Sequence, residues 1–144
     1  MGSVSYKRLL DDHERITQSV NALLDLVSET CPNIDGLLSL RAKLSTELRE
    51  HWSNEDELYS VWNSTPKASD SLITLGSFLE DYASVRRSWD DYLYEWDTES
   101  IEVDWSFFCS ETRGVAAWFL QKMAVENADI YPLAVKLGLI ALRD

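Results

Sequence analysis

The stretch HWSNEDELY, residues 51–59, places two polar side chains in an otherwise apolar helix face. His51 and Glu55 lie four residues apart, so on a helix they stack one turn above the other. Leucines precede the pair on that face, and Leu58 and Trp62 follow it. A histidine and a carboxylate in line with core residues cost free energy unless each finds a partner. The sequence therefore predicts a buried polar site inside a helical core.

Composition limits the class of protein. A chain of 144 residues fits one domain, residues 1–144, and only 5 glycines and 3 prolines favour long helices. A net charge of -12 argues against nucleic acid and anionic membranes as partners, and no apolar run approaches the ~20 residues of a membrane span. The isolated Cys31 and Cys109 are typical of reduced thiols. We therefore expect a cytoplasmic protein.

Apolar residues at helical spacing predict an all-α fold of four long helices. They cover about residues 5–28, 34–62, 66–96 and 104 onward, with Thr65 and Pro66 as N-cap and first turn of the third. We expect the acidic residues 97–103 to form a loop and Pro132 to kink or end the last helix near Tyr131. Short connections between such helices favour an up-down-up-down bundle.

Each of the four helices has polar interruptions in its apolar face, and antiparallel succession brings these to one end of the bundle. The residues concerned are His13, His51, Glu55, Tyr82, Lys122 and Glu126. The acidic pair Asp11 and Asp12, in contrast, reads as part of a solvated face. A weak internal repeat relates the first two helices to the last two, with Tyr and Lys in the second copy where the first has histidine.

Three motifs make nearly the whole chain resemble the hemerythrin-like (HHE cation-binding) family: LDDHERI at 10–16, HWSNEDELY at 51–59 and ENADIYPLA at 126–134. The resemblance implies a bundle with two irons, bound by histidines and bridging glutamates, that binds oxygen, senses iron or oxygen, or handles oxidants. Four family ligand positions match, namely His13, His51, Glu55 and Glu126. Tyr82 and Lys122 stand where the family has the histidines of the third and fourth helices.

These two departures argue against an intact two-iron site. A lysine at neutral pH has no free lone pair, so Lys122 supplies a positive charge, which we expect within hydrogen-bond reach of Glu126 or Glu55. Tyr82 would bind ferric iron as a phenolate but more simply donates a hydrogen bond to a carboxylate. We expect well under two irons per chain.

Two functions remain open, because a working oxygen carrier or diiron oxidase needs nitrogen ligands that this chain lacks. The first is a non-catalytic regulatory or interaction module without a cofactor. Its partner would be another protein or a second copy of the chain, with Trp52, Trp105 and Trp118 as a candidate interface. The alternative is a sensing or oxidative-stress protein with one iron, manganese or zinc ion on the four matching ligands. Neither function assigns a catalytic residue, so we expect no enzyme.

Overall fold

The structure, a computed structural model, describes residues 4–64 and 72–144, without the side chains of residues 72–79 and 81. Within these ranges the regular secondary structure is helical, apart from one bridge between Ser5 and Ala141. The elements are α1 (Tyr6–Leu26), α2 (Ile34–Asn63), α3 (Leu72–Glu95), α4 (Thr98–Val103), α5 (Trp105–Val125), a π-helical turn η2 (Glu126–Ile130) and α6 (Tyr131–Lys136). The predicted all-α class is confirmed.

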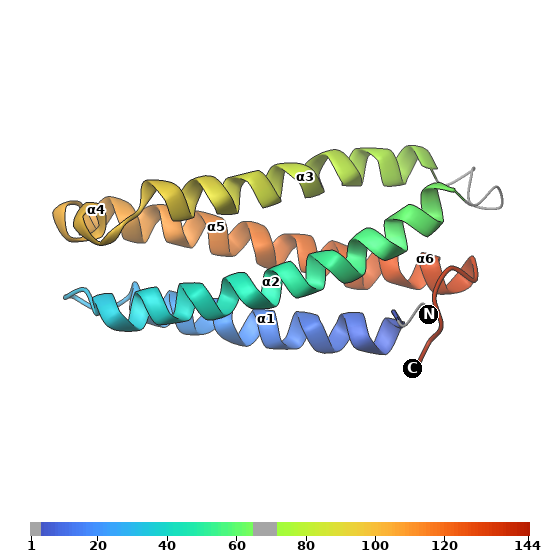
Figure 1. The fold of residues 1–144 in the computed structure, drawn as a ribbon, viewed down its shortest axis with the longest axis horizontal. Helices are drawn as coiled ribbons and strands as arrows, with labels where there is room; N and C mark the ends of the chain where they lie inside the picture. Colours follow the sequence, from blue (N-terminus) through green and yellow to red (C-terminus); the bar gives the residue numbers. More distant parts are fainter. Residues whose placement is uncertain (1–3, 65–71) are drawn as a thin grey trace.

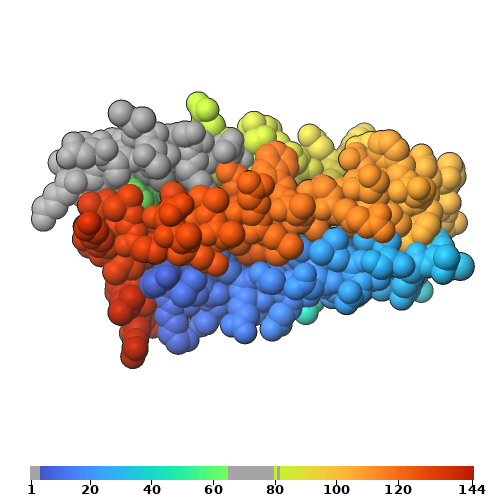
Figure 2. All heavy atoms as spheres, turned by 180° about the vertical axis from the view of Figure 1, so that it is seen from behind, coloured from blue at the N-terminus to red at the C-terminus, as the bar shows by residue number. Residues whose placement is uncertain are grey.

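The four long helices lie alongside one another on the long axis of the molecule (Figure 1). Figure 2, seen from behind, shows α5 and the C-terminal segment directly against α1. The start of α1 pairs with the C-terminal segment, because the backbone N–H groups of Tyr6 and Lys7 donate to the carbonyls of Ala141 and Leu142 at 2.9 and 3.1 Å. No helix in the described part of the chain is long and apolar enough to cross a membrane.

Side-chain caps define where the first two helices begin. The Ser5 hydroxyl accepts from the N–H of Arg8 at 3.1 Å, and the Asn33 side chain accepts from the N–H of Gly36 at 3.0 Å. Such caps satisfy backbone donors that a helix start leaves without partners. The predicted cap at Thr65 and Pro66 lies outside the described residues.

The prediction of a loop at residues 97–103 is wrong, because this stretch forms α4. Asp97 caps α4 by accepting from the N–H of Ser100 at 2.8 Å, and Ile101 is completely buried. Acidic residues near a helix start interact favourably with the helix dipole. The acidic residues that suggested a loop, Asp97 and Glu99, therefore stabilise the start of a short helix.

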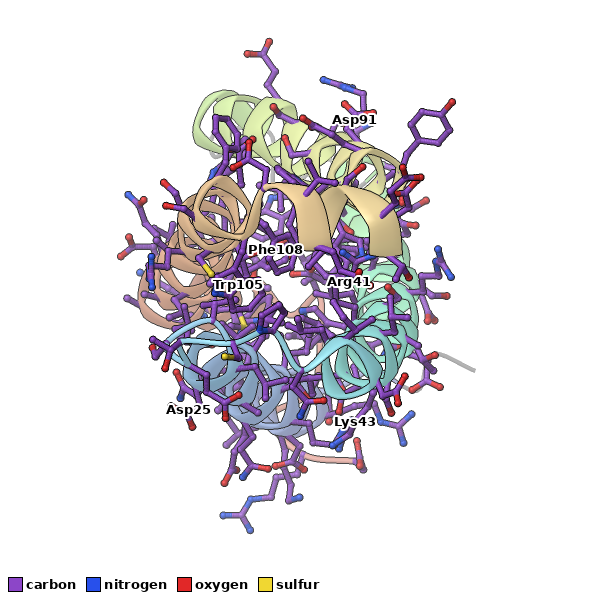
Figure 3. All side chains as sticks on the ribbon, turned by 90° about the vertical axis from the view of Figure 1, so that its left-hand side faces the viewer. Asp25, Arg41, Lys43, Asp91, Trp105 and Phe108 are labelled. Carbon is purple, nitrogen blue, oxygen red and sulfur yellow. The ribbon has the colours of Figure 1, made fainter. Side chains whose placement is uncertain are left out.

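Viewed along the long axis, the core side chains Trp105, Phe108 and Arg41 point between the helices, and charged residues such as Asp25 and Lys43 lie on the outside (Figure 3). Trp52, Trp105 and Trp118 are each half-buried and pack against the core. A protein or self-association interface at these tryptophans stays a prediction.

The buried apolar residues form two clusters. Along α1 and α2, buried polar residues lie between the members of one cluster and the members of the other. In α1, His13 lies between Leu9 of one cluster and Ile16 of the other. In α2 the pair of polar residues lies between Leu48 and Leu58, which again belong to different clusters. A layer of buried polar residues thus lies between two apolar clusters.

The final helix changes its hydrogen-bond pattern before Pro132. Proline has no N–H, and its ring clashes with the carbonyl four residues earlier, which here belongs to Ala128. Regular α-helix ends at Val125, and in the π-turn that follows the N–H of Tyr131 donates to the carbonyl of Glu126, five residues back. The disturbance expected near Tyr131 therefore begins earlier, at Glu126.

Candidate metal-binding site

Four side chains from three elements meet in the polar layer. His13 comes from α1, His51 and Glu55 from α2, and Glu126 from the π-turn. Their exposed fractions are 2%, 3%, 1% and 3%, and one ligand atom from each lies within 4.8 Å of the others. The four residues that match the family's ligand positions are thus gathered at one buried point.

The ligand atoms face one another at short range. The Nε2 atoms of His13 and His51 are 2.9 Å apart. His13 Nε2 lies 3.1 Å from Glu126 Oε1, and His51 Nε2 lies 3.3 Å from Glu55 Oε1. Each histidine therefore faces the other histidine and one carboxylate.

The other ring nitrogen of each histidine already has an oxygen acceptor. His51 Nδ1 donates to Asp12 Oδ2 at 2.9 Å, and His13 Nδ1 donates to Asn127 Oδ1 at 2.7 Å. With hydrogen on Nδ1, the Nε2 atom of a neutral histidine is a lone-pair donor. Two such lone pairs at 2.9 Å repel unless a proton or a metal cation lies between them. The pair of histidines is thus built to hold a cation.

The expectation that Asp12 lies on a solvated face is wrong. Its exposed fraction is 6%, and besides His51 it accepts from Asn54 Nδ2 at 3.1 Å and from Arg15. Asp12 lies on the side of α1 that packs on α2. Histidines that bind metals commonly donate their second N–H to a carboxylate in this way.

Two tyrosines complete the hydrogen bonding of the carboxylates. Tyr131 Oη donates to Glu55 Oε2 at 2.6 Å and also lies 3.1 Å from His13 Nε2 and 3.2 Å from His51 Nε2. Tyr59 Oη donates to Glu126 Oε2 at 3.1 Å and approaches Glu55 Oε2 at 3.4 Å. Sequence reasoning missed both. Tyr59 was detectable, because it follows Glu55 by four residues on the same helix face.

Electrostatics within the cluster assign one proton to the histidine pair. Burial lowers the pKa of His51, but the carboxylates of Glu55 and Asp12 outweigh burial and raise it to about 9. Burial and the charge on His51 lower the pKa of His13 to about 4. At neutral pH, protonated His51 therefore donates through Nε2 to neutral His13.

The two glutamates differ in protonation. Burial raises the pKa of Glu55, but the cationic His51 and hydrogen bonds from Glu126 and Tyr131 outweigh it, so that this pKa lies below its ordinary value. Burial and the charge of Glu55 raise the pKa of Glu126 well above its ordinary value. Without a metal, the charges of His51 and Glu55 balance, and Glu126 keeps its proton.

Tyr82 and Lys122 line a small cavity of about 30 Å³ beside the cluster, together with Glu55 and Glu126. A space of this size holds about one water molecule. Tyr82 Oη donates to the carbonyl of Trp52 at 3.2 Å and to the Asp56 carboxylate at 3.4 Å.

Lys122 is half-buried, and its charge partly offsets the rise in the pKa of Glu126. Its direct hydrogen bond to Glu126 or Glu55 stays a prediction.

No protein-family model, no curated protein and no solved structure matches this chain. The resemblance to the hemerythrin-like family therefore depends on its three motifs and on the residues that they place in the cluster.

Proposed function

We propose that this protein is a hemerythrin-like, up-down-up-down four-helix bundle that binds a single metal ion and serves in sensing or in the response to oxidants. The ligands are the four clustered residues His13, His51, Glu55 and Glu126. One observation carries the proposal: two histidine Nε2 atoms converge with two carboxylates while both Nδ1 atoms are held by oxygen acceptors. The free thiols Cys31 and Cys109 support a reducing, cytoplasmic setting.

The spacing of the ligand atoms fits a common ion. Donor atoms about 2.0–2.2 Å from one ion, at angles of about 90–109°, lie about 2.8–3.6 Å apart. The three close separations in the cluster, 2.9, 3.1 and 3.3 Å, fall in this range. Two imidazoles and two carboxylates suit iron, manganese or zinc. These three separations need little change when an ion binds.

The surrounding residues give each ligand a fixed direction. Asp12 and Asn127 hold the two imidazole rings with their Nε2 atoms inward. Hydrogen bonds of this kind also make the ligating nitrogen more basic, and their loss commonly lowers metal affinity by about 10–100-fold. A bound iron would supply redox chemistry, and the chain would supply orientation and the exclusion of water.

The residues that would bind a second metal ion in the family are replaced here by a tyrosine and a lysine. Tyr82 and Lys122, at positions where the family has histidines, line the small cavity together with Glu55 and Glu126. An ammonium group repels a second cation and has no lone pair to offer a metal. This is why we propose one ion and not two.

A regulatory or interaction module without metal is the second candidate. It is favoured by the protonation of His51, which balances the charge of Glu55 without an ion. Such a polar cluster specifies one packing of a bundle even where it adds little stability.

Metal binding to chelator-stripped protein separates the two candidates. We expect one equivalent of Fe(II), Mn(II) or Zn(II) to bind in a calorimetric titration, and elemental analysis to find no more than one ion per chain. Glu55→Gln removes a charged ligand and should weaken binding at least ~100-fold. Glu57→Gln, an exposed change two residues away, should not. If no metal binds, the metal-free module is the remaining candidate. If two equivalents of metal bind, the second half of the two-metal site has not been lost.

Metal affinity should also rise with pH. His51 must lose its proton to ligate an ion, and its pKa is about 9. Below that pH the proton on His51 alone weakens apparent affinity about tenfold per unit, and the proton that Glu126 must also lose steepens the dependence, so affinity should increase from pH 6 to 9. A chromophoric chelator competing for Zn(II) measures this slope. An affinity that stays constant over the range would mean that His51 is not a ligand.

A further inference from the structure

The Tyr131 hydroxyl lies among the proposed ligands and not at their edge. Its oxygen is 2.6 Å from Glu55 Oε2 and 3.1 and 3.2 Å from the Nε2 atoms of His13 and His51. Tyr131 has an exposed fraction of 0%. The two distances to the histidine Nε2 atoms fall in the range of about 2.8–3.6 Å given above for donors on one ion, whereas the 2.6 Å contact is a hydrogen bond to the second oxygen of Glu55. By its distances to both Nε2 atoms, the phenol oxygen is placed where a further donor to the same ion would lie.

The π-turn is what brings Tyr131 to this place. In a regular α-helix, residues five apart point about 140° away from each other, at 3.6 residues per turn. The wider π-turn, closed by the N–H of Tyr131 on the carbonyl of Glu126, turns both side chains to one side. Single π-turns of this kind occur frequently at functional sites.

We propose that Tyr131 is a fifth ligand, binding through its phenolate oxygen, and that it directs the site toward a ferric ion. This inference rests on the proposed metal-binding function and names the ion that the site prefers. On binding, the phenol O–H bond breaks, its proton passes to water, and an oxygen lone pair forms the bond to iron. The iron enters as Fe(III) and remains Fe(III), so no electron is transferred.

Charge supports a trivalent ion. With Tyr131 ionised, the shell holds three anionic oxygen donors, the other two being Glu55 and Glu126, beside two neutral imidazoles. Three negative charges neutralise Fe(III) in a buried layer, whereas Zn(II) would leave one charge uncompensated. Hard trivalent cations also prefer anionic oxygen ligands.

The two other nearby tyrosines provide matched comparisons. Tyr59 donates to the two glutamates, and Tyr82 donates to Trp52 and Asp56. Tyr131 additionally approaches the Nε2 atoms of both histidines. Replacing each tyrosine by phenylalanine removes one hydroxyl and keeps the ring, so the three variants differ only in which oxygen is lost.

The test loads stripped protein with ferric nitrilotriacetate, removes the excess and records visible absorption and resonance Raman spectra. We expect a phenolate-to-iron charge-transfer band with phenolate vibrations enhanced in it. Tyr131→Phe should abolish the band and lower the preference for Fe(III) over Zn(II) at least tenfold, while still binding Zn(II). Tyr59→Phe and Tyr82→Phe should keep the band.

Each other outcome has a distinct meaning. Bound iron without the band in the parent protein would overturn the assignment of Tyr131 and leave the metal site intact. A band lost only in Tyr59→Phe or only in Tyr82→Phe would overturn it in the same way. If neither Fe(III) nor Zn(II) binds, the proposed function itself fails. If Tyr131→Phe does not fold, the double variant Tyr59→Phe and Tyr82→Phe decides, because the band must survive in it.

Discussion

Asp12→Ala is expected to lower the free energy of unfolding of the metal-free protein by about 3 kcal/mol, a large part of the stability of a domain of this size. The Asp12 carboxylate is buried and accepts from His51 Nδ1 at 2.9 Å. Without it, a buried protonated histidine loses one of its two compensating charges. If His51 sheds that proton instead, its Nδ1–H still has no acceptor. Urea unfolding followed by circular dichroism measures the loss.

Two further variants distinguish loss of the Asp12–His51 hydrogen bond from general effects of changing α1. Glu14→Ala changes an exposed residue two positions away and should stay within about 0.5 kcal/mol of the parent. Asp12→Asn keeps an oxygen acceptor and should lose less than Asp12→Ala. Equal unfolding midpoints for the parent and Asp12→Ala would show that His51 does not depend on this partner.

The cluster of His13, His51, Glu55 and Glu126 was predictable because regular helix geometry relates these residues. His51 and Glu55 share a helix face by their spacing of four, and His13 interrupts an apolar face at a regular position. Apolar neighbours on both sides then require each of them to be buried. Sequence reasoning can identify such residues wherever the backbone keeps the regular α-helical repeat.

Tyr131 and Asn127 were missed because the backbone departs from that repeat. Both follow Glu126 within or just after the π-turn, so α-helical spacing assigns their side chains to the wrong sides. The presence of Pro132 predicts a disturbance but not its kind, since a kink, a helix end and a wider turn all accommodate a missing N–H.

Asp12 was assigned to solvent for a different reason. A run of two aspartates is usually exposed, and burial of one depends on which partner the neighbouring helix presents. His51 lies 39 positions away in the chain, and the sequence does not specify that contact. Residues that support a metal site through hydrogen bonds, as Asp12 supports His51, are therefore harder to predict from sequence than the proposed ligands themselves.

Replacing Tyr82 and Lys122 together with histidine is expected to raise metal binding from one ion per chain to two. Both side chains line the same small cavity as Glu55 and Glu126, so imidazoles there would supply nitrogen ligands close to the same carboxylates. The change also removes the ammonium charge that opposes a second cation. Elemental analysis and titration of stripped protein with Fe(II) give the stoichiometry.

The matched control is the pair Tyr82→Phe and Lys122→Met, which removes the same hydroxyl and charge but adds no ligand. It should still bind one ion, since relief of repulsion does not replace missing donors. The guanidinium of Arg86, which contacts Tyr82 and lies 2.7 Å from Asp56, remains in both variants and opposes a second ion equally in each. A difference between them therefore reports the imidazoles alone. One ion in the double-histidine variant would mean that α3 and α5 do not present these positions as the hemerythrin-like arrangement requires.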